Sequence, residues 1–136
     1  MRDALADLVA RYGGDGDSTP MAAAEFEPPA GGFLVGFLDG VPVGSAAWRS
    51  RTDDPTVAEL KRMYTVPAAR GRGVGRRLLA AVEESARSAG RKRLVLECGD
   101  RQPEAIGLYH ACGYERIEDF GYYRGHPGVL SFGLDL

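Results

Sequence analysis

Two apolar, β-prone runs joined by Asp39-Gly40 constrain the fold of this chain more than any other sequence feature. The runs extend from Phe33 to Leu38 and from Val41 to Trp48. Aspartate and glycine tolerate the positive φ angles that both central positions of a type I′ turn require, so this dipeptide favours a two-residue hairpin. We therefore predict an antiparallel strand pair over residues 33–48.

Helical and strand patterns alternate along the rest of the chain. Apolar residues at helical spacing predict a helix over 3–12, followed by a loop with at most a short helix near 22–26. The remaining patterns predict strands over 57–66, 94–96, 114–117 and 130–134, and helices over 73–89 and 103–112. This order is typical of a mixed α/β layer fold, and the length of 136 residues suits a single domain over 1–136.

Composition excludes several classes of protein. Apolar residues make up 44% of the chain and charged residues 26%, both close to the globular average. No apolar run approaches the roughly 20 residues that cross a bilayer, and residues 1–11 lack the apolar core of a secretory signal. Two cysteines and two histidines are too few for a disulfide scaffold or a conventional zinc site. We therefore expect a soluble, cytoplasmic protein with no membrane partner and no metal.

Positive charge is concentrated in one short block. Residues 60–82 carry six basic and no acidic side chains, whereas residues 1–59 carry four basic and ten acidic ones. Residues 83–136 carry seven basic and nine acidic side chains. A nucleic-acid binder usually has a basic balance over the whole domain, so no nucleic-acid partner is expected. A short basic block is better suited to binding a small polyanion than to binding a nucleic acid.

The segment from Arg70 to Gly75 lies within this block, between a predicted strand and a predicted helix. Its sequence, Arg-Gly-Arg-Gly-Val-Gly, lets the backbone approach a ligand closely and permits positive φ. Free N–H groups and the helix dipole make a helix N-terminus a ready anion site. The segment matches neither the P-loop nor the dinucleotide-binding pattern. It predicts a pyrophosphate site, and the plain alternative is a glycine-rich turn with solvated arginines.

The stretch from Leu60 to Arg76 resembles the acetyl-CoA-binding core of the GNAT superfamily of N-acetyltransferases. The family pattern Arg/Gln-x-x-Gly-x-Gly/Ala is matched by Arg70, Gly73 and Gly75. The segments 94–98, 104–109 and 113–114 are similar to the family's next strand, helix and Gly-aromatic step, so the resemblance covers about residues 33–136. It implies an α/β fold with a central, mostly antiparallel mixed sheet flanked by helices. The family's usual first strand is expected to be missing from this chain or to lie upstream of Met1.

The resemblance implies an acetyl-CoA-dependent N-acetyltransferase that transfers acetyl directly to a primary amine of a small molecule or peptide. Backbone groups of the third strand would pair with the pantetheine arm, and the glycine-rich turn would hold the pyrophosphate. The implied cofactor-binding residues are Met63, Tyr64, Thr65, Arg70, Gly71, Arg72, Gly73, Val74, Gly75 and Arg76. The alternative is a non-catalytic acyl-CoA-binding or sensing domain. Many members of the superfamily form dimers, so the resemblance also allows a homodimer.

Two residues are expected to carry the proton transfers. Tyr109 matches the family's tyrosine near the thioester sulfur and would protonate the departing thiolate; the alternative is a core aromatic. Glu59 is the preferred general base, and the alternative is a strand carboxylate paired with arginine or lysine. Glu25 and Glu27 are weaker candidates. The acidic balance of residues 1–59 favours a cationic amine as the acceptor.

Overall fold

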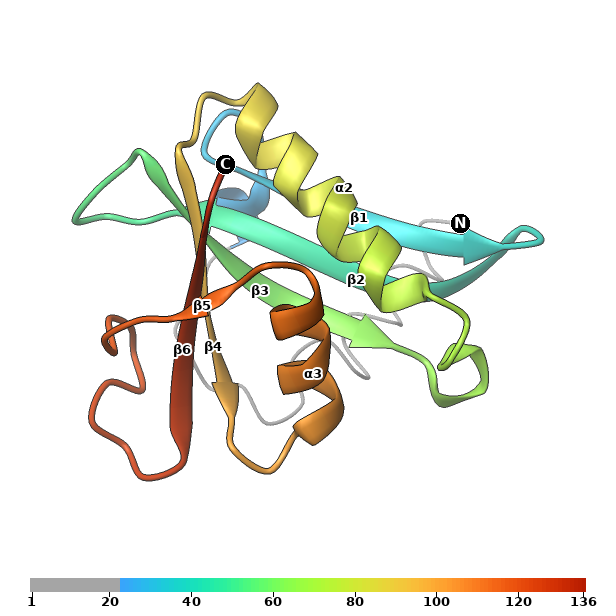
Figure 1. The fold of residues 1–136 in the computed structure, drawn as a ribbon. Coiled ribbons are helices and arrows are strands. Elements are labelled where there is room, and N and C mark those ends of the chain that lie inside the picture. The colour runs from blue at the N-terminus through green and yellow to red at the C-terminus, as the bar shows by residue number, and fades with distance from the viewer. Residues whose placement is uncertain (1–22) are drawn as a thin grey trace.

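The structure, a computed structural model, describes residues 23–136. The predicted helix over 3–12 lies outside these residues. A 3-10 turn, η2, opens the described part, and six strands, two α-helices and a second 3-10 turn follow it (Figure 1). Their bounds are η2 (Ala23–Phe26), β1 (Gly31–Leu38), β2 (Val41–Ser50), β3 (Val57–Thr65), η3 (Pro67–Ala69), α2 (Val74–Ser88), β4 (Arg93–Gly99), α3 (Pro103–Ala111), β5 (Glu115–Arg116) and β6 (Val129–Asp135).

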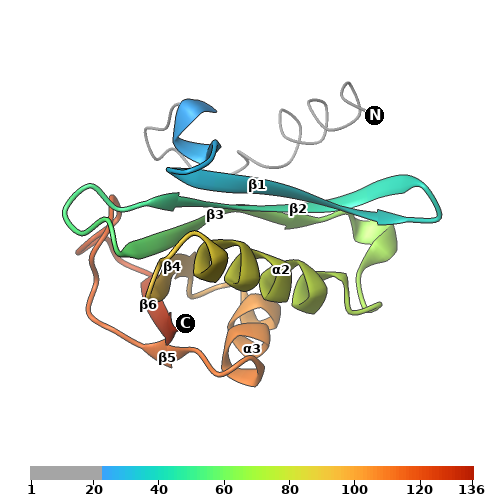
Figure 2. The same cartoon turned by 90° about the horizontal axis from the view of Figure 1, so that it is seen from above.

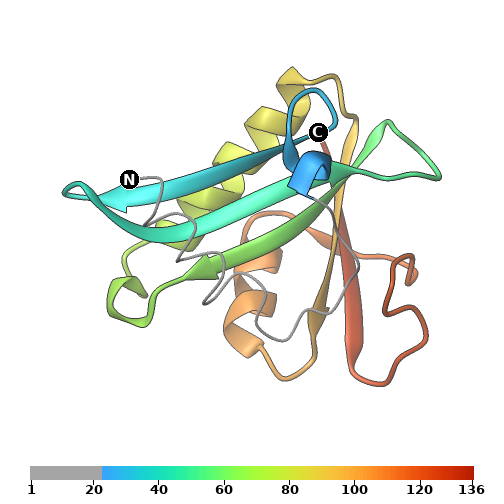
Figure 3. The same ribbon diagram turned by 180° about the vertical axis from the view of Figure 1, so that it is seen from behind.

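The strands form one six-stranded sheet in the order β1-β2-β3-β4-β6-β5. Only β3 and β4 run parallel, and every other neighbouring pair is antiparallel. Both α2 and α3 lie on one side of the sheet (Figure 2), and η2 lies on the opposite face (Figure 3). The predicted mixed, mostly antiparallel α/β fold is confirmed.

The predicted hairpin is present at its predicted turn. Asp39 and Gly40 have φ angles of 50° and 79°, and Leu38 pairs with Val41 across the turn. Two positive φ angles are the signature of the turn type that an Asp-Gly dipeptide favours. The local sequence therefore specifies the turn and the pairing beside it, and a bulge shifts the register between Gly36 and Phe37.

Helix α2 is attached to the sheet by an apolar stripe. Its buried residues are Val74, Leu78, Leu79, Val82 and Ala86. Leu79 is fully buried together with Trp48 of β2 and Phe132 of β6, and the Trp48 indole N–H donates to the Ser85 hydroxyl at 2.9 Å. Burial of a leucine side chain contributes about 1.5–3 kcal/mol. This packing fixes the start of α2, and with it the glycine-rich turn, beside the end of β3.

Strands β3 and β4 separate soon after they meet. They pair only from Val57 to Glu59 on β3, opposite Arg93 to Val95 on β4. Beyond Glu59, β3 also contains a bulge, because two residues, Arg62 and Met63, lie between Lys61 and Tyr64 where a single residue lies between their partners on β2. Arg62 in this bulge has a φ of 57°, and its carbonyl accepts a hydrogen bond from the Ser45 hydroxyl at 2.9 Å. The residues of β3 beyond Glu59 consequently have no β4 partner on that edge.

The predicted strands all differ from the observed ones by one or more residues, and two differ by at least half of their predicted length. The strand predicted over 94–96 extends over 93–99, because Glu97 and Cys98 also pair with β6. The strand predicted over 114–117 is reduced to Glu115–Arg116, a short edge strand. Both differences come from pairing with β6, a strand distant in sequence.

Candidate active site

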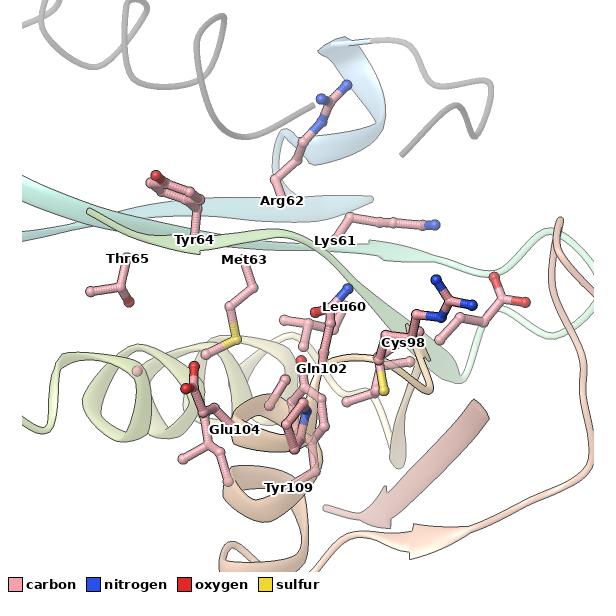
Figure 4. A pocket seen from close by; sticks show the side chains of 18 of the residues that line it. Leu60, Lys61, Arg62, Met63, Tyr64, Thr65, Cys98, Gln102, Glu104 and Tyr109 are labelled. Atoms are coloured by element: carbon pink, nitrogen blue, oxygen red, sulfur yellow. The ribbon is translucent and has the colours of Figure 1, made fainter. Parts of the chain in front are cut away.

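A cleft of about 1450 Å³ opens where β3 and β4 separate. One wall is β3 from Leu60 to Thr65, and the opposite wall is formed by β4 over 96–99 and the start of α3. The glycine-rich turn and the first residues of α2 close one end, and residues 126–129 also line the cleft. Figure 4 shows side chains of β3, β4 and α3 around this space. Nine of the ten predicted cofactor-binding residues line it; Arg72, which is exposed, does not.

The glycine-rich turn presents unpaired backbone donors to the cleft. Gly73 is the N-cap of α2 with a φ of 78°, and Gly71 has a φ of 80°. The first helical bond runs from the Arg77 amide to the Gly73 carbonyl at 3.1 Å, so the preceding amides have no helical acceptor. A Cβ at Gly71 or Gly73 would meet no atom within 4 Å. Any residue other than glycine would therefore strain the backbone at these two positions. The space beside the turn is free for a ligand to occupy.

Other residues hold this turn against β3. The Arg70 side chain donates to the Thr65 carbonyl at 3.1 Å, and its guanidinium lies 5.6 Å from the centre of the Tyr64 ring. A Cβ at Gly75 would lie 3.3 Å from the Leu108 side chain and 3.7 Å from that of Met63. Glycine at this position lets α2, α3 and β3 approach closely at one end of the cleft.

Tyr109 lies deep in the cleft on α3. Its side chain is 7% exposed, and its ring lies 5.8 Å from the rings of Tyr114 and Phe132. Burial raises the pKa of Tyr109 above its usual value, so the phenol keeps its proton. Figure 4 shows Tyr109 of α3 and Met63 of β3 in the same space. The tyrosine thus belongs to the core and also lines the cleft.

Glu59 is buried within a network of ion pairs. Its carboxylate lies 3.3 Å from the Arg49 Nε and 3.5 Å from the Lys61 Nζ. It lines a second, smaller cavity of about 320 Å³ that also contains Glu25, whose carboxylate is 2.9 Å from Arg49. These ion pairs are the contacts expected if Glu59 is a strand carboxylate paired with arginine or lysine, which is the alternative to a catalytic role. The role of Glu59 as a base stays a prediction.

Glu97 of β4 is a functional candidate that the sequence analysis missed. Both of its carboxylate oxygens are buried, no side chain of the described residues donates a hydrogen bond to them, and the backbone N–H of Tyr123 stabilises the charged form. Burial raises its pKa, and the nearby charge of Glu59 adds to the rise while that of Lys61 opposes it. Alternation along β4 could have indicated this position, because Leu94 and Leu96 face the core and Glu97 falls on the other side.

The cysteines do not supply an activated nucleophile. Cys98 lines the cleft, but burial raises the pKa of its thiol to about 11. A thiol with a raised pKa is poorly ionised near neutral pH and therefore weakly nucleophilic. Cys112 is half-buried, and the two thiols are free. This chemistry is consistent with direct transfer to the acceptor.

Residues 23–136 contain no helix that is both long and apolar enough to cross a membrane. They also contain no group of three or more His, Cys, Asp or Glu side chains arranged to hold a metal ion.

The sequence matches the model of the acetyltransferase (GNAT) family over residues 2–114. The chain belongs to the GNAT acetyltransferase family. Its fold agrees, since the mixed, mostly antiparallel sheet with helices that the resemblance implies is present. The resemblance inferred from the sequence is confirmed.

Individual relatives are similar over most of this chain. It is 41% identical over 95 residues to an IAA acetyltransferase of Azospirillum brasilense, covering 70% of this chain and 61% of that protein. It is 37% identical over 98 residues to an aminoglycoside N(6')-acetyltransferase type 1 of Stenotrophomonas maltophilia, covering 68% and 64%. The chain thus spans less than two thirds of the length of these curated relatives. A Klebsiella pneumoniae protein assigned as an acyl-CoA N-acyltransferase matches in structure with a TM-score of 0.81 and 28% identity, covering 98% of this chain and 90% of that one.

Proposed function

We propose that this GNAT protein is an acetyl-CoA-dependent N-acetyltransferase that transfers acetyl directly to a primary amine. The observation that carries the proposal is the arrangement of one cleft. An open backbone anion site closes one end of it, the unpaired edge of β3 forms its wall, and buried Tyr109 lies on the other side. The name of the Klebsiella neighbour, an acyl-CoA N-acyltransferase, supports the same donor class.

The cleft fits the chemical parts of acetyl-CoA. The amides at the start of α2 suit a pyrophosphate, because they have no helical acceptors and no side chain covers them. Backbone groups of Met63, Tyr64 and Thr65 have no β4 partner, so they can pair with the amides of a pantetheine arm as an added strand would. Arg70 and Arg76 line the cleft and add positive charge near the phosphates.

Acetyl-CoA supplies an acetyl thioester, from which the amine takes the acetyl group as the thiolate leaves. Tyr109 is placed to protonate that thiolate, because its buried phenol holds its proton and lines the cleft. The acceptor ammonium must first lose a proton to a base. Glu59 is the base that the sequence analysis predicts, and its carboxylate is buried beside the separation of β3 and β4.

The acceptor is proposed to be a cationic amine of a small molecule or a peptide. Carboxylates on the face of the sheet opposite α2 include Glu25 and Glu59, although both pair with Arg49. The acidic balance of residues 1–59 would attract a cation and raise its local concentration. The relative from Stenotrophomonas is named for an aminoglycoside, a class that carries several amines.

The experiment is a thiol-release assay with acetyl-CoA and a panel of polyamines, aminoglycosides, amino-terminal peptides and acidic amino acids. We expect turnover with at least one cationic amine and a kcat/KM that falls at higher salt. Calorimetric titration with CoA runs in parallel. Tight CoA binding without turnover on any amine would support the non-catalytic alternative, and absence of CoA binding would contradict both.

A further inference from the structure

We propose that Arg51 is a positioning residue for the acceptor amine, because it fixes the loop over 117–128 that forms the acceptor side of the cleft. The inference rests on the proposed N-acetyltransferase function and deepens it. The loop joins β5 to β6 and consists of turns and irregular segments throughout. Loops of about 12 residues or more without secondary structure are uncommon in compact domains and are usually functional.

The two ends of β3 belong to different parts of the proposed reaction. The glycine-rich turn comes after Thr65, the last residue of β3, and is the proposed seat of the donor pyrophosphate. The loop over 51–56 comes before Val57, the first residue of β3, so it lies at the opposite end. Figures 1 and 3 show this loop and the loop over 117–128 at the same end of the molecule. We expect the acceptor to approach from this end, because the donor occupies the other.

The loop between β5 and β6 forms part of the cleft wall. Its residues Tyr123 and His126 line the main cleft, and their rings lie 5.8 Å apart. The His126 amide donates to the Tyr123 carbonyl at 2.9 Å, so the two side chains move together. A Cβ at Gly121 would lie 2.5 Å from a carboxylate oxygen of Glu97, so the loop backbone lies directly against a cleft side chain. Any shift of the loop therefore moves the wall that an acceptor would contact.

Arg51 attaches this loop to the segment between β2 and β3. Its Nη2 donates to the Phe120 carbonyl at 3.2 Å, and the guanidinium carbon lies 4.7 Å from the centre of the Phe120 ring. The Asp53 carboxylate accepts from Nε at 2.8 Å and from Nη2 at 2.9 Å, which fixes the guanidinium plane. The Arg51 side chain is 17% exposed. A bidentate ion pair, a carbonyl contact and a ring contact on one largely buried arginine make a firmer attachment than a surface ion pair does.

The segment that carries Arg51 is itself fixed. The Arg51 amide donates to the Val57 carbonyl at 2.9 Å, which closes the segment onto β3. The Asp54 carboxylate accepts from the Thr56 hydroxyl at 2.6 Å and from the Thr56 amide at 3.1 Å. Arg51 and Phe120 both line the second cavity, so their contact determines how far apart the two loops lie. Arg51 thus transfers the position of β3 to the loop between β5 and β6.

Loss of this attachment has a specific kinetic signature. Without Arg51 the loop holds its proper position for only a fraction of the time, and the apparent affinity of the acceptor falls by that fraction. A hydrogen bond to a charged group corresponds to roughly 10–10²-fold in an equilibrium constant. Once the acceptor is bound the loop is in place, so the chemical step is unaltered. The acceptor KM should therefore rise by roughly 10–10²-fold, with kcat and the Kd for CoA unchanged.

Steady-state kinetics on the best amine of the panel test this signature in Arg51→Gln. Arg87→Gln is the matched control, because it removes an arginine–carboxylate pair with Glu84 on the exposed surface of α2 and should change none of the three constants. A purely structural role for Arg51 would lower kcat through loss of folded enzyme and leave the acceptor KM as it is. An unchanged acceptor KM in Arg51→Gln, or an equal rise in Arg87→Gln, would overturn the proposal.

A second variant tests the contact itself. Phe120→Leu keeps the carbonyl that accepts from Arg51 but removes the ring. Because the two residues act as a pair, the rise in acceptor KM in the double variant with Arg51→Gln should be smaller than the product of the two single rises. A double variant whose rise equals that product would show that Arg51 acts on the acceptor by another route.

Amide hydrogen exchange measures the attachment without any substrate. In Arg51→Gln the amides of Arg124 and His126, which donate within the loop, should exchange roughly 10-fold faster or more, and those of α2 should keep the parent rate. Equal exchange in parent and variant would contradict the role of Arg51. The parent protein separates the two levels of failure: absence of CoA binding, or of turnover on every amine, contradicts the proposed function, whereas turnover with unchanged loop exchange contradicts the role of Arg51 alone.

Discussion

Replacement of Gly73 by valine tests the glycine-rich turn most directly. The residue has a φ of 78°, and a Cβ there would meet no atom within 4 Å. The side chain therefore causes no clash inside the protein. It imposes backbone strain and covers the amides that precede the first helical bond, which runs from Arg77 to Gly73.

The backbone strain lowers the free energy of unfolding, whereas the covered amides weaken CoA binding, so the two effects are measured separately. A non-glycine residue at such a φ costs about 1–3 kcal/mol of folding free energy. Three amides at the start of α2, those of Val74, Gly75 and Arg76, have no helical acceptor. If valine blocks two of them, loss of two charge-assisted hydrogen bonds costs about 3–6 kcal/mol. We therefore expect CoA affinity to fall by roughly 10²–10⁴-fold.

Gly90 provides the matched control. It follows the other end of α2 with a φ of 84°, and a Cβ there also meets nothing within 4 Å. Gly90→Val should therefore lose about the same 1–3 kcal/mol in urea unfolding but keep its CoA affinity in calorimetric titration. The interpretation fails if folded Gly73→Val binds CoA within threefold of the parent, or if Gly90→Val loses as much affinity.

Three further predictions concern the cleft. Tyr109→Phe should lower kcat in the thiol-release assay by roughly 10²–10⁴-fold with little change in CoA affinity; unchanged turnover would leave Tyr109 a packing residue. The Kd for CoA should rise with added salt, because phosphate contacts are screened, and a Kd independent of salt from low to high ionic strength would argue against the arginines near the turn. Burial raises the Glu97 pKa above its unfolded value, so the free energy of unfolding should fall as pH rises through the folded pKa. Glu97→Gln should remove that fall and be more stable than the parent at the higher pH in urea unfolding; a parent stability that rises over this range would contradict it.

Local sequence specifies the parts of the fold that depend on neighbouring residues. The Asp39-Gly40 turn, the apolar stripe of α2 and the glycine at the start of α2 each follow from local rules, and each is present as predicted. Nine of the ten predicted cofactor-binding residues line one cleft, because they fall in two short runs that are close together in the sequence.

Features that depend on distant strands were not predictable in this way. The extension of β4 to Gly99 requires β6 beside it, and the β3 bulge depends on its register with β2. Of the two cations that pair with Glu59, Lys61 is a sequence neighbour on β3, but Arg49 comes from β2, so the local sequence reveals only one of them. Glu97 lies in the segment 94–98 that resembles the family, but only the folded chain shows that its carboxylate oxygens are buried.

The point at which β3 and β4 separate determines where the cleft lies in the fold. The parallel pairing of β3 with β4 stops at Glu59 and Val95. Immediately beyond that point, the β3 edge loses the partner that its backbone groups would have had, and Glu97, two residues further along β4, faces the cleft. An unpaired strand edge and a half-buried carboxylate therefore line the same cleft. Additional β3–β4 pairing would satisfy more backbone groups and close the cleft, so the unpaired edge is retained at a cost in stability, as expected of a functional site.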